Sequence, residues 1–247
     1  MKKLTKVLAL VFALIMLMSS TAMAKEYVAA TNPEFPPFES VGDSGEMVGI
    51  DIDILNALIA KMDSASTVRI DAMDFGALIP SLLSGKIEII IAGMSATDER
   101  KQSVDFTDPY FDAVQAVIVQ EGSAIKTESD LAGKKIGVQL GTTGDLYVTD
   151  NIKASEINRF NKGIDAVQDV ISGRLDAVVI DAAPAAVFAQ QAKGLVLLDE
   201  KLNSGNEQYA IAIAKGNEEL LKGLNAALAE IKADGTLDAI LAKHMAG

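Results

Sequence analysis

The chain has 247 residues and a formal net charge of −12 at pH 7, with 22 Lys and Arg residues against 34 Asp and Glu residues. This acidic balance argues against nucleic acid or an anionic membrane surface as a partner, because both repel negative charge. The sequence contains no cysteine, which excludes disulfides and a lipidated N-terminal cysteine.

The first residues have the features of a secretory signal peptide. Residues 1–24 combine a Lys-rich start, an apolar stretch through Met18 and the small-residue end Ala22-Met23-Ala24. We therefore predict cleavage after Ala24 and a periplasmic location. A retained membrane anchor is the alternative, but the apolar stretch is shorter than the ~20 residues that span a bilayer. Cleavage removes three lysines and no acidic residue, so the formal charge falls from −12 to −15.

Hydrophobic periodicity in the first part of the chain predicts alternating strands and helices. A Pro-rich loop, residues 32–38, follows the first strand, and Asp51 is placed to cap the first helix. That helix presents apolar residues at helical spacing, and Gly85 ends the next one. The predicted strands are residues 27–31, 47–50, 68–73 and 87–91, and the predicted helices start at residue 51 and span residues 77–84.

The same alternation continues to the C-terminus. Repeated βαβ patterns without a long strand-only region predict an α/β protein. No obvious linker divides the chain, so a two-lobed arrangement must use crossing strands. The predicted strands are residues 114–120, 135–140, 175–180, 195–198 and 208–214. The predicted helices are one that follows residues 141–145 and runs to about residue 151, then residues 163–172, 182–192 and 220–231, with a last one from residue 236.

One stretch carries candidate binding chemistry. The apolar strand 87–91 runs into Ala92-Gly93, and Ser95, Thr97 and Arg100 follow. In open α/β sheets, ligands bind just past the carboxyl ends of the strands. An arginine fork beside hydroxyls and free backbone N–H groups grips a planar carboxylate with two parallel hydrogen bonds. The alternative is a surface arginine, with Thr97 capping a short helix.

The mature chain contains the blocks ATNPEFPPFES, GEMVGIDIDILNALI, DFGALIPSLLSGKIEIIIAGMSATDERKQSVDFTDPYF, KKIGVQLGTTGD, GRLDAVVID and ADGTLDAILAKH. In this order and spacing they resemble the periplasmic solute-binding proteins of ABC importers for polar amino acids, the extracellular solute-binding proteins of family 3. The resemblance implies a two-lobed, Venus-flytrap α/β fold that closes over one amino acid. It implies hinges near residues 119–121 and 206–210, which gives one lobe of residues 25–118 plus 209–247 and a second lobe of residues 119–208.

The resemblance also implies roles for the main-chain groups of a bound amino acid. Arg100 holds the α-carboxylate with help from Ser95. The Gly-rich turn that contains Thr142 and Thr143 adds donors, because a helix N-terminus carries free N–H groups and partial positive charge. Asp181 accepts from the α-ammonium, with the backbone at Gly93 as a second partner. An N-cap for the helix that follows is an alternative or companion role of Asp181.

The side chain of the ligand has its own candidate partners in the resemblance. Phe35 and Phe75 occupy positions where the family stacks aromatic rings on the ligand, and core packing is the alternative for each. Basic-amino-acid binders often carry Asp where this chain has Asn32. The Ala92-Gly93 pair resembles glutamine and arginine binders, so arginine and glutamine are the favoured ligands. Further polar candidates are Gln139, Glu34 and Asp74.

Two other functions stay open at this point. Dehydratases for prephenate-like acids resemble the same family, but they need a placed general acid, and His244 is expected to be exposed and remote from the cleft. A sensory protein for a receptor would have the same binding chemistry. We expect no catalysis, no cofactor and no metal site, since the chain has one His and no cluster at metal-ligand spacing. The expected partners are an amino acid and the membrane subunits of an ABC importer, with no nucleic acid and a monomeric carrier.

Overall fold

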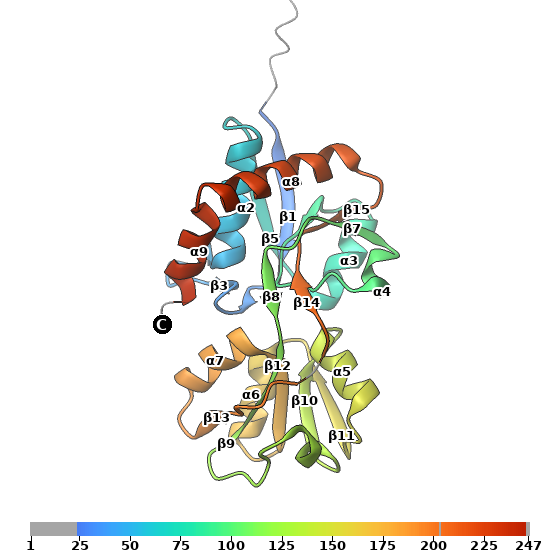
Figure 1. Ribbon diagram of the computed structural model, residues 1–247, viewed down its shortest axis with the longest axis vertical. Helices are drawn as coiled ribbons and strands as arrows, with labels where there is room; N and C mark the ends of the chain where they lie inside the picture. The colour runs from blue at the N-terminus through green and yellow to red at the C-terminus, as the bar shows by residue number, and fades with distance from the viewer. Residues whose placement is uncertain (1–23, 203, 246–247) are drawn as a thin grey trace, which may run out of the picture.

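The computed structural model describes residues 24–202 and 204–245, so the predicted signal peptide lies outside the described residues except for Ala24. The chain forms two α/β lobes, one above the other (Figure 1). Each lobe contains one five-stranded sheet. The α/β class and the two-lobed arrangement predicted from the sequence are confirmed.

Lobe one is built on the sheet with the order β5-β1-β6-β15-β7. Strand β1 runs parallel to β5 and β6, whereas β15 runs antiparallel to β6 and β7. The sheet strands are β1 (Glu26–Thr31), β5 (Thr67–Ala72), β6 (Ile89–Ile90), β7 (Val104–Phe106) and β15 (Ala212–Ala214). A small sheet beside them contains β2 (Glu34–Phe35), β3 (Glu39–Val41) and β4 (Met47–Val48).

Helices cover the sheet of lobe one. The apolar face of α2 is buried with that of α8, and Leu55, Leu58 and Leu224 belong to one core cluster. Burying each such side chain stabilises the fold by about 1.5–3 kcal/mol, which fixes the helix pair against the sheet. The helices of lobe one are α2 (Ile50–Met62), α3 (Phe75–Leu83), α4 (Asp98–Lys101), α8 (Glu218–Ala233) and α9 (Thr236–Met245).

Lobe two is built on the sheet with the order β11-β10-β12-β9-β13. Strand β10 runs parallel to β11 and β12, so the carboxyl ends of β10 and β12 lie at one edge of the sheet, the edge that faces lobe one (Figure 1). The elements are β9 (Gln115–Gln120), η1 (Glu128–Leu131), β10 (Lys135–Gln139), α5 (Thr143–Asn151), β11 (Glu156–Phe160), α6 (Gly163–Ile171), β12 (Ala177–Asp181), α7 (Ala182–Gln191) and β13 (Leu195–Leu197).

Two short strands connect the lobes. Strands β8 (Phe111–Ala113) and β14 (Glu207–Tyr209) pair antiparallel and run from one lobe to the other (Figure 1). The first crossing differs in position from the expected one near residues 119–121. Residues 115–119 of β9 pair with β12 and are buried in lobe two, so the chain has already crossed before β9 begins.

Further features of the structure differ from the sequence prediction. Strand β11 was not predicted, since it has only half-buried or exposed residues and forms the edge of its sheet. The predicted strand 208–214 is two strands, because the chain leaves the connection and enters the sheet of lobe one between them. His244 is half-buried, with its Nε2 2.7 Å from Asp53 Oδ2 on α2, although it does not line the cleft.

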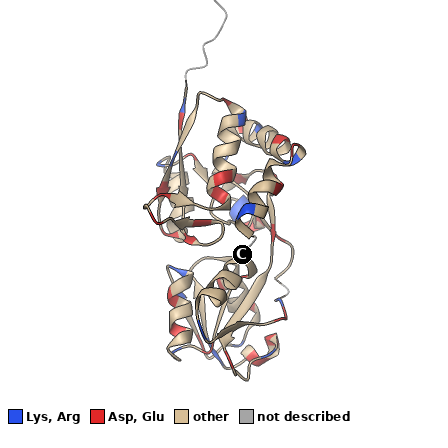
Figure 2. Ribbon diagram, turned by 90° about the vertical axis from the view of Figure 1, so that its left-hand side faces the viewer, with Lys and Arg blue, Asp and Glu red and all other residues tan. Residues whose placement is uncertain are grey.

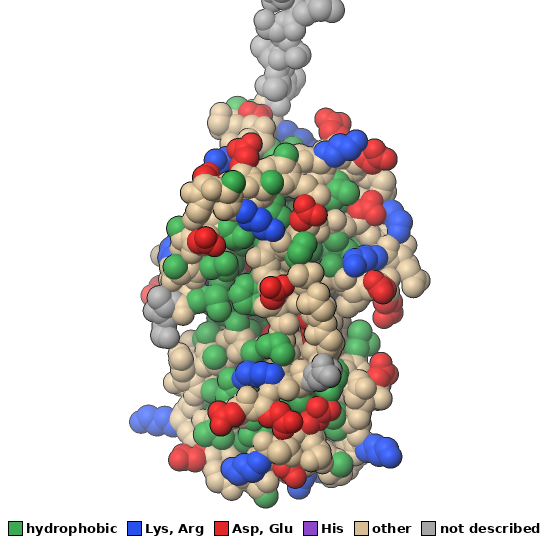
Figure 3. Space-filling view, viewed as in Figure 1, with side chains coloured by type: hydrophobic (Ala, Val, Ile, Leu, Met, Phe, Trp, Pro, Cys, Tyr) green, Lys and Arg blue, Asp and Glu red, His purple; other side chains and the backbone are tan. Residues whose placement is uncertain are grey.

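Acidic and basic residues are distributed over both lobes (Figure 2). Among residues 24–202 and 204–245, no helix combines the length and the apolar character needed to cross a bilayer. The side chains of the two lobes meet at the waist of the molecule on the face shown in Figure 3.

Candidate functional site

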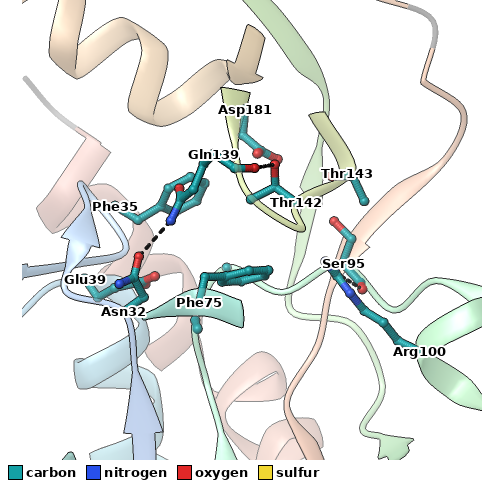
Figure 4. A pocket seen from close by; sticks show the side chains of 12 residues that line it. Asn32, Phe35, Glu39, Phe75, Ser95, Arg100, Gln139, Thr142, Thr143 and Asp181 are labelled. Atoms are coloured by element: carbon teal, nitrogen blue, oxygen red, sulfur yellow. Dashed lines mark hydrogen bonds between the residues drawn. The ribbon is translucent and has the colours of Figure 1, made fainter. Parts of the chain in front are cut away.

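A cavity between the lobes brings the predicted site residues together (Figure 4). About 290 Å³ of the space within its lining is not filled by atoms, and this volume includes open solvent. All the predicted site residues except the polar candidates Glu34 and Asp74 line the cavity, and so does Glu39, which was not predicted. The lining residues are Asn32, Phe35, Glu39, Phe75, Ala92, Gly93, Ser95, Arg100, Gln139, Thr142, Thr143 and Asp181.

Arg100 enters the cavity from the short helix α4. Thr97 caps that helix, and its Oγ1 accepts from the N–H of Arg100 at 3.2 Å. The predicted capping role of Thr97 and the position of Arg100 in the cleft are therefore compatible. The guanidinium donates to the carbonyl oxygen of Ser95 at 2.8 Å and, across the cleft, to that of Gly141 at 3.0 Å. Its Cζ lies 5.3 Å from the centroid of the Phe75 ring, within cation–π range.

The charge of Arg100 is maintained inside this partly buried site. Burial lowers the pKa of the guanidinium, while the negative charges of Asp181 and Glu207 raise it. An arginine keeps its proton in proteins, so the cavity contains a fixed cation. We call Arg100, together with Ser95 and Thr143, the carboxylate end of the cavity.

The turn at Gly93 requires glycine. Its φ is +51°, and a Cβ atom there would lie 2.8 Å from Cε1 of Phe35. Its N–H donates to Oδ2 of Asp51 at 2.7 Å, and the hydroxyl of Tyr110 donates to the same oxygen at 2.9 Å. The prediction that Asp51 caps α2 is wrong, because Gly49 is the N-cap and Asp51 is buried in the first turn, where it supports the Gly93 turn.

The Gly-rich turn of lobe two faces Arg100 across the cleft. Thr142 is the N-cap of α5 and accepts from the N–H of Asp145 at 3.3 Å. Asp145 in turn accepts from the N–H of Gly141 at 3.1 Å, and Arg159 donates to Asp145 at 2.9 Å. These bonds hold the helix N-terminus in place beside the carboxylate end, where its partial positive charge favours an anion.

Asp181 ends strand β12 and points into the cavity (Figure 4). It occupies the N-cap position of α7, but its side chain makes no capping hydrogen bond, so the predicted companion role is wrong. Its Oδ1 accepts instead from the hydroxyl of Tyr209, on the connecting strand β14, at 2.7 Å. Burial, followed by the negative charge of Glu207, raises the pKa of Asp181 to about 7. A cation beside Asp181 would favour its ionised form.

Glu39 is the lining residue that the sequence prediction missed. It is 0% exposed, and no donor among the described residues bonds to either of its oxygens. Burial, followed by the charge of Asp51, a hydrogen bond to Asp51 and the charge of Asp181, raises its pKa well above the usual value, so without a cation nearby Glu39 is a neutral carboxyl whose O–H donates to Asp51. The pairing of β2 with β3 sets Glu39 directly opposite Phe35, and no spacing rule in the sequence reveals that pairing. The only signal was an acidic residue directly after an apolar Pro-Pro-Phe run.

Gln139 and Asn32 meet beside Glu39. Nε2 of Gln139 donates to Oδ1 of Asn32 at 2.9 Å across the lobes, while Nδ2 of Asn32 donates to the carbonyl oxygen of Met73 at 3.0 Å (Figure 4). Oε1 of Gln139 is buried and has no partner among the described residues. We call Asn32, Glu39 and Gln139 the side-chain end of the cavity, where Oε1 of Gln139 is an acceptor without a donor among the described residues.

The other two polar candidates lie outside the cavity lining. Glu34 accepts from Nζ of Lys162 at 2.6 Å, and Asp74 accepts from Nδ2 of Asn161 at 3.1 Å. Both contacts join lobe one to lobe two. Together with the Arg100–Gly141 and Gln139–Asn32 bonds, they show that the structure has the lobes closed on each other.

Comparisons with known proteins agree with this architecture. The sequence model of the bacterial extracellular solute-binding proteins, family 3, matches residues 27–247. The chain belongs to that family. The predicted family and the predicted non-catalytic class are therefore confirmed, because the family binds solutes. Within the described residues, no group of three or more acidic or His side chains is arranged to hold a metal ion.

Three similar proteins have close sequence matches. The ABC transporter arginine-binding protein 1 of Escherichia coli (strain K12) is 38% identical over 211 residues, which are 83% of this chain and 85% of that protein. A solved structure of an ancestral arginine-binding protein bound to arginine is 43% identical with a TM-score of 0.83, over 89% of this chain and 97% of that one. A structure of an ancestral arginine-binding protein bound to glutamine is 44% identical with a TM-score of 0.84, over 90% and 98% of the two chains.

Proposed function

We propose that this protein binds L-arginine in the interlobe cavity and delivers it to the membrane subunits of an ABC importer. In this proposal Arg100, Ser95 and the turn at Thr142 and Thr143 receive the α-carboxylate, and Asp181 receives the α-ammonium. The similar proteins named for arginine binding support the ligand class. Because the two halves of the site belong to different lobes, only the closed form engages the whole ligand, and the ligand shifts the equilibrium toward closure.

The groups of the side-chain end are the reason for proposing arginine and not glutamine as the ligand. No donor among the described residues bonds to Oε1 of Gln139 or to the oxygens of Glu39, and a cation beside Glu39 would favour its ionised, acceptor-only form over the neutral carboxyl that bonds to Asp51. A guanidinium group has five N–H donors and no acceptor, so it matches a set of free acceptors. A carboxamide such as that of glutamine brings an acceptor of its own, which would face Glu39 without a donor. An unpartnered buried carboxylate is costly, and a cationic partner removes that cost.

The aromatic residues contribute to the same choice. Phe35 is buried beside Gly93 and Tyr209, and the Phe75 ring faces the Arg100 guanidinium. We propose that Phe35 and Phe75 border the ligand's aliphatic stem and guanidinium, with a contribution of about 0.5–2 kcal/mol from cation–π contact.

The proposal includes the location and organisation of the carrier. We infer that the mature protein begins after Ala24, acts as a monomer in the periplasm and needs no cofactor. The division into a lobe of residues 25–118 plus 209–247 and a lobe of residues 119–208 stays part of the proposal. The pairing of β9 with β12 favours moving the first boundary to β8.

Calorimetry with three ligands tests the proposal. L-Citrulline has the shape of arginine with a neutral end, and L-glutamine is the second candidate ligand. We expect the wild-type protein to bind L-arginine roughly 10- to 100-fold more tightly than either, because hydrogen bonds to charged groups contribute about 1.5–3 kcal/mol. Equal affinity for arginine and citrulline, or a preference for glutamine, would contradict the assignment of arginine.

The variant Glu39→Gln locates the preference. It keeps the shape of the side chain and removes its charge, so it should lower arginine affinity by roughly 10-fold or more and leave citrulline affinity within about threefold. Glu34→Gln is the matched control, since Glu34 is an acidic residue of the neighbouring strand that pairs with Lys162 outside the cavity. An equal loss in both variants would show that Glu39 does not read the ligand's charge.

A further inference from the structure

A chain of buried hydrogen bonds passes behind the carboxylate end and joins the two lobes. Oγ of Ser95, in lobe one, donates to Oε2 of Glu207 at 3.2 Å. Nε2 of Gln115, in lobe two, donates to the same oxygen at 3.2 Å and to Oγ1 of Thr143 at 3.1 Å. Glu207 itself lies on the connecting strand β14. One carboxylate oxygen therefore links a candidate ligand donor of each lobe.

The three central residues are shielded from solvent. Ser95 is 3%, Gln115 is 0% and Glu207 is 6% exposed, and none of the links depends on a flexible surface side chain. Backbone bonds from Ala96 to Gln208 and from Ala210 to Met94 fix the Ser95 loop against β14. On the other side, Gln115 is the register partner of Asp181 in the pairing of β9 with β12.

Gly144 allows Gln115 to approach the first turn of α5. A Cβ atom at Gly144 would lie 2.7 Å from Oε1 of Gln115, so a larger residue would push Gln115 away from Thr143. Gln115 is thus held between Glu207 and the helix N-terminus. Neither Gln115 nor Glu207 lines the cavity.

We propose that Glu207 and Gln115 are positioning residues that hold the lobe-one and lobe-two halves of the carboxylate end in register when the lobes close. This inference rests on the proposed function, in which Ser95 and Thr143 contact the ligand carboxylate. Glu207 acts from the connecting strand, the part of the molecule that must change when the lobes separate. The bridge therefore makes the donors of one lobe depend on the position of the other lobe.

A double-mutant cycle on Ser95 and Gln115 tests the bridge. The two side chains lie in different lobes, and the structure connects them only through Glu207 among the hydrogen bonds of the described residues. Calorimetry with L-arginine and L-glutamine, which share the α-carboxylate, should show a loss of about 3- to 10-fold for each of Ser95→Ala and Gln115→Met. The double variant should lose at least about threefold less than the product of the single losses, because the second change cuts a bridge already broken.

The control cycle pairs Ser95→Ala with Gln208→Ala. Gln208 lies next to Glu207 on β14, and its side chain donates to Asp112 at the surface. We expect these two losses to multiply within about twofold, the limit for independent sites. A Glu207→Met background, which removes the acceptor oxygen, should remove the coupling between Ser95 and Gln115, and ligand-free melting temperatures verify that each variant is folded.

In the Ser95–Gln115 cycle, an affinity loss of the double variant that equals the product of the two single losses within about twofold would overturn the inference. The proposed function would stand, since the wild-type protein would still bind its amino acid. Failure of the wild-type protein to bind either L-arginine or L-glutamine would overturn the proposed function, and the inference with it. Coupling that persists in the Glu207→Met background would show that another contact joins the lobes, and would also overturn the inference.

Discussion

The two ends of the cavity differ in how fully their polar groups are satisfied. At the carboxylate end, Arg100 donates to two carbonyl oxygens, and Ser95 and Thr143 are tied to Glu207 and Gln115. At the side-chain end, no donor among the described residues bonds to Glu39 or to Oε1 of Gln139; behind the carboxylate end the same holds for Oε1 of Gln115 and Oε1 of Glu207, which do not line the cavity. The carboxylate end is held by the protein itself, whereas the side-chain end contains acceptors that await donors.

This difference assigns separate tasks to the two ends. A ligand carboxylate that enters the carboxylate end replaces acceptors that already bond to rigid donors of the protein. Little ordering of protein side chains is therefore required on binding. A side chain that enters the second end supplies donors to acceptors that had none. We therefore expect the carboxylate end to contribute to the binding of every α-amino acid, and the side-chain end to select among them.

Arg100→Ala should produce the largest effect. Removing the guanidinium leaves the ligand carboxylate without its charged partner, so affinity should fall by more than about 100-fold for arginine and glutamine alike. Calorimetry with both ligands measures the effect. Arg69→Ala is the control, because Arg69 pairs with Asp71 on the exposed side of β5. A loss of affinity for arginine but not for glutamine would break the comparison, since it would mean that Arg100 selects the ligand side chain, as the side-chain end is expected to do.

The pH dependence should be intermediate in size. Burial raises the pKa of Asp181 to about 7 and that of Asp51 to about 6 in the ligand-free protein. Both pKa values exceed 3.8, the pKa of an Asp in the unfolded chain. The stability that protonated Asp181 and Asp51 contribute is therefore fully present below pH 3.8 and is lost as the pH rises through 6 to 7. The α-ammonium of the ligand needs Asp181 ionised, so affinity should change in the opposite direction and rise about tenfold between pH 6 and pH 8.

Calorimetry and melting temperatures at a series of pH values measure both trends. Measured with L-glutamine, whose side chain does not require Glu39 to be ionised, Asp181→Asn should bind more weakly and should lose most of the pH dependence of affinity. A retained tenfold rise in that variant would transfer the titration from Asp181 to the carboxyl groups at Glu39 and Asp51. Such a result would sharpen the comparison, because the side-chain end would then control the pH response.

Lys162→Met should produce the smallest effect. Lys162 joins the lobes through Glu34 at the rim, outside both ends of the cavity, and its side chain is 44% exposed. Exposed ion pairs contribute about 0–1 kcal/mol and weaken with salt, so arginine affinity should fall by less than about fivefold at low salt and less still in 0.5 M NaCl. Titrations at the two salt concentrations measure this. A loss above tenfold would show that the rim, and not the two ends, holds the lobes closed.

Much of the carboxylate end was predictable because its groups lie in contiguous motifs. Ser95, Thr97 and Arg100 follow one buried strand, and the Gly-rich turn follows another, so local rules place each group at the edge of its sheet. The aromatic and polar candidates Phe35, Phe75, Asn32 and Gln139 also line the cavity. Glu34 and Asp74 do not, because their strand and helix positions turn them toward Lys162 and Asn161 at the rim.

The sequence by itself determined the α/β class and the edges of the strands where the binding groups gather, because hydrophobic periodicity and turn residues act over short distances along the chain. It also determined the family, through the resemblance of six sequence blocks in their order and spacing. Only the tertiary structure decided that Glu39 is buried opposite Phe35, that Asp51 supports the Gly93 turn and that Glu207 joins Ser95 to Gln115. Each of these contacts links residues through a hairpin, a helix packed on a loop or a connection between lobes. Their energies depend on the arrangement of the whole chain, and no local pattern specifies that arrangement.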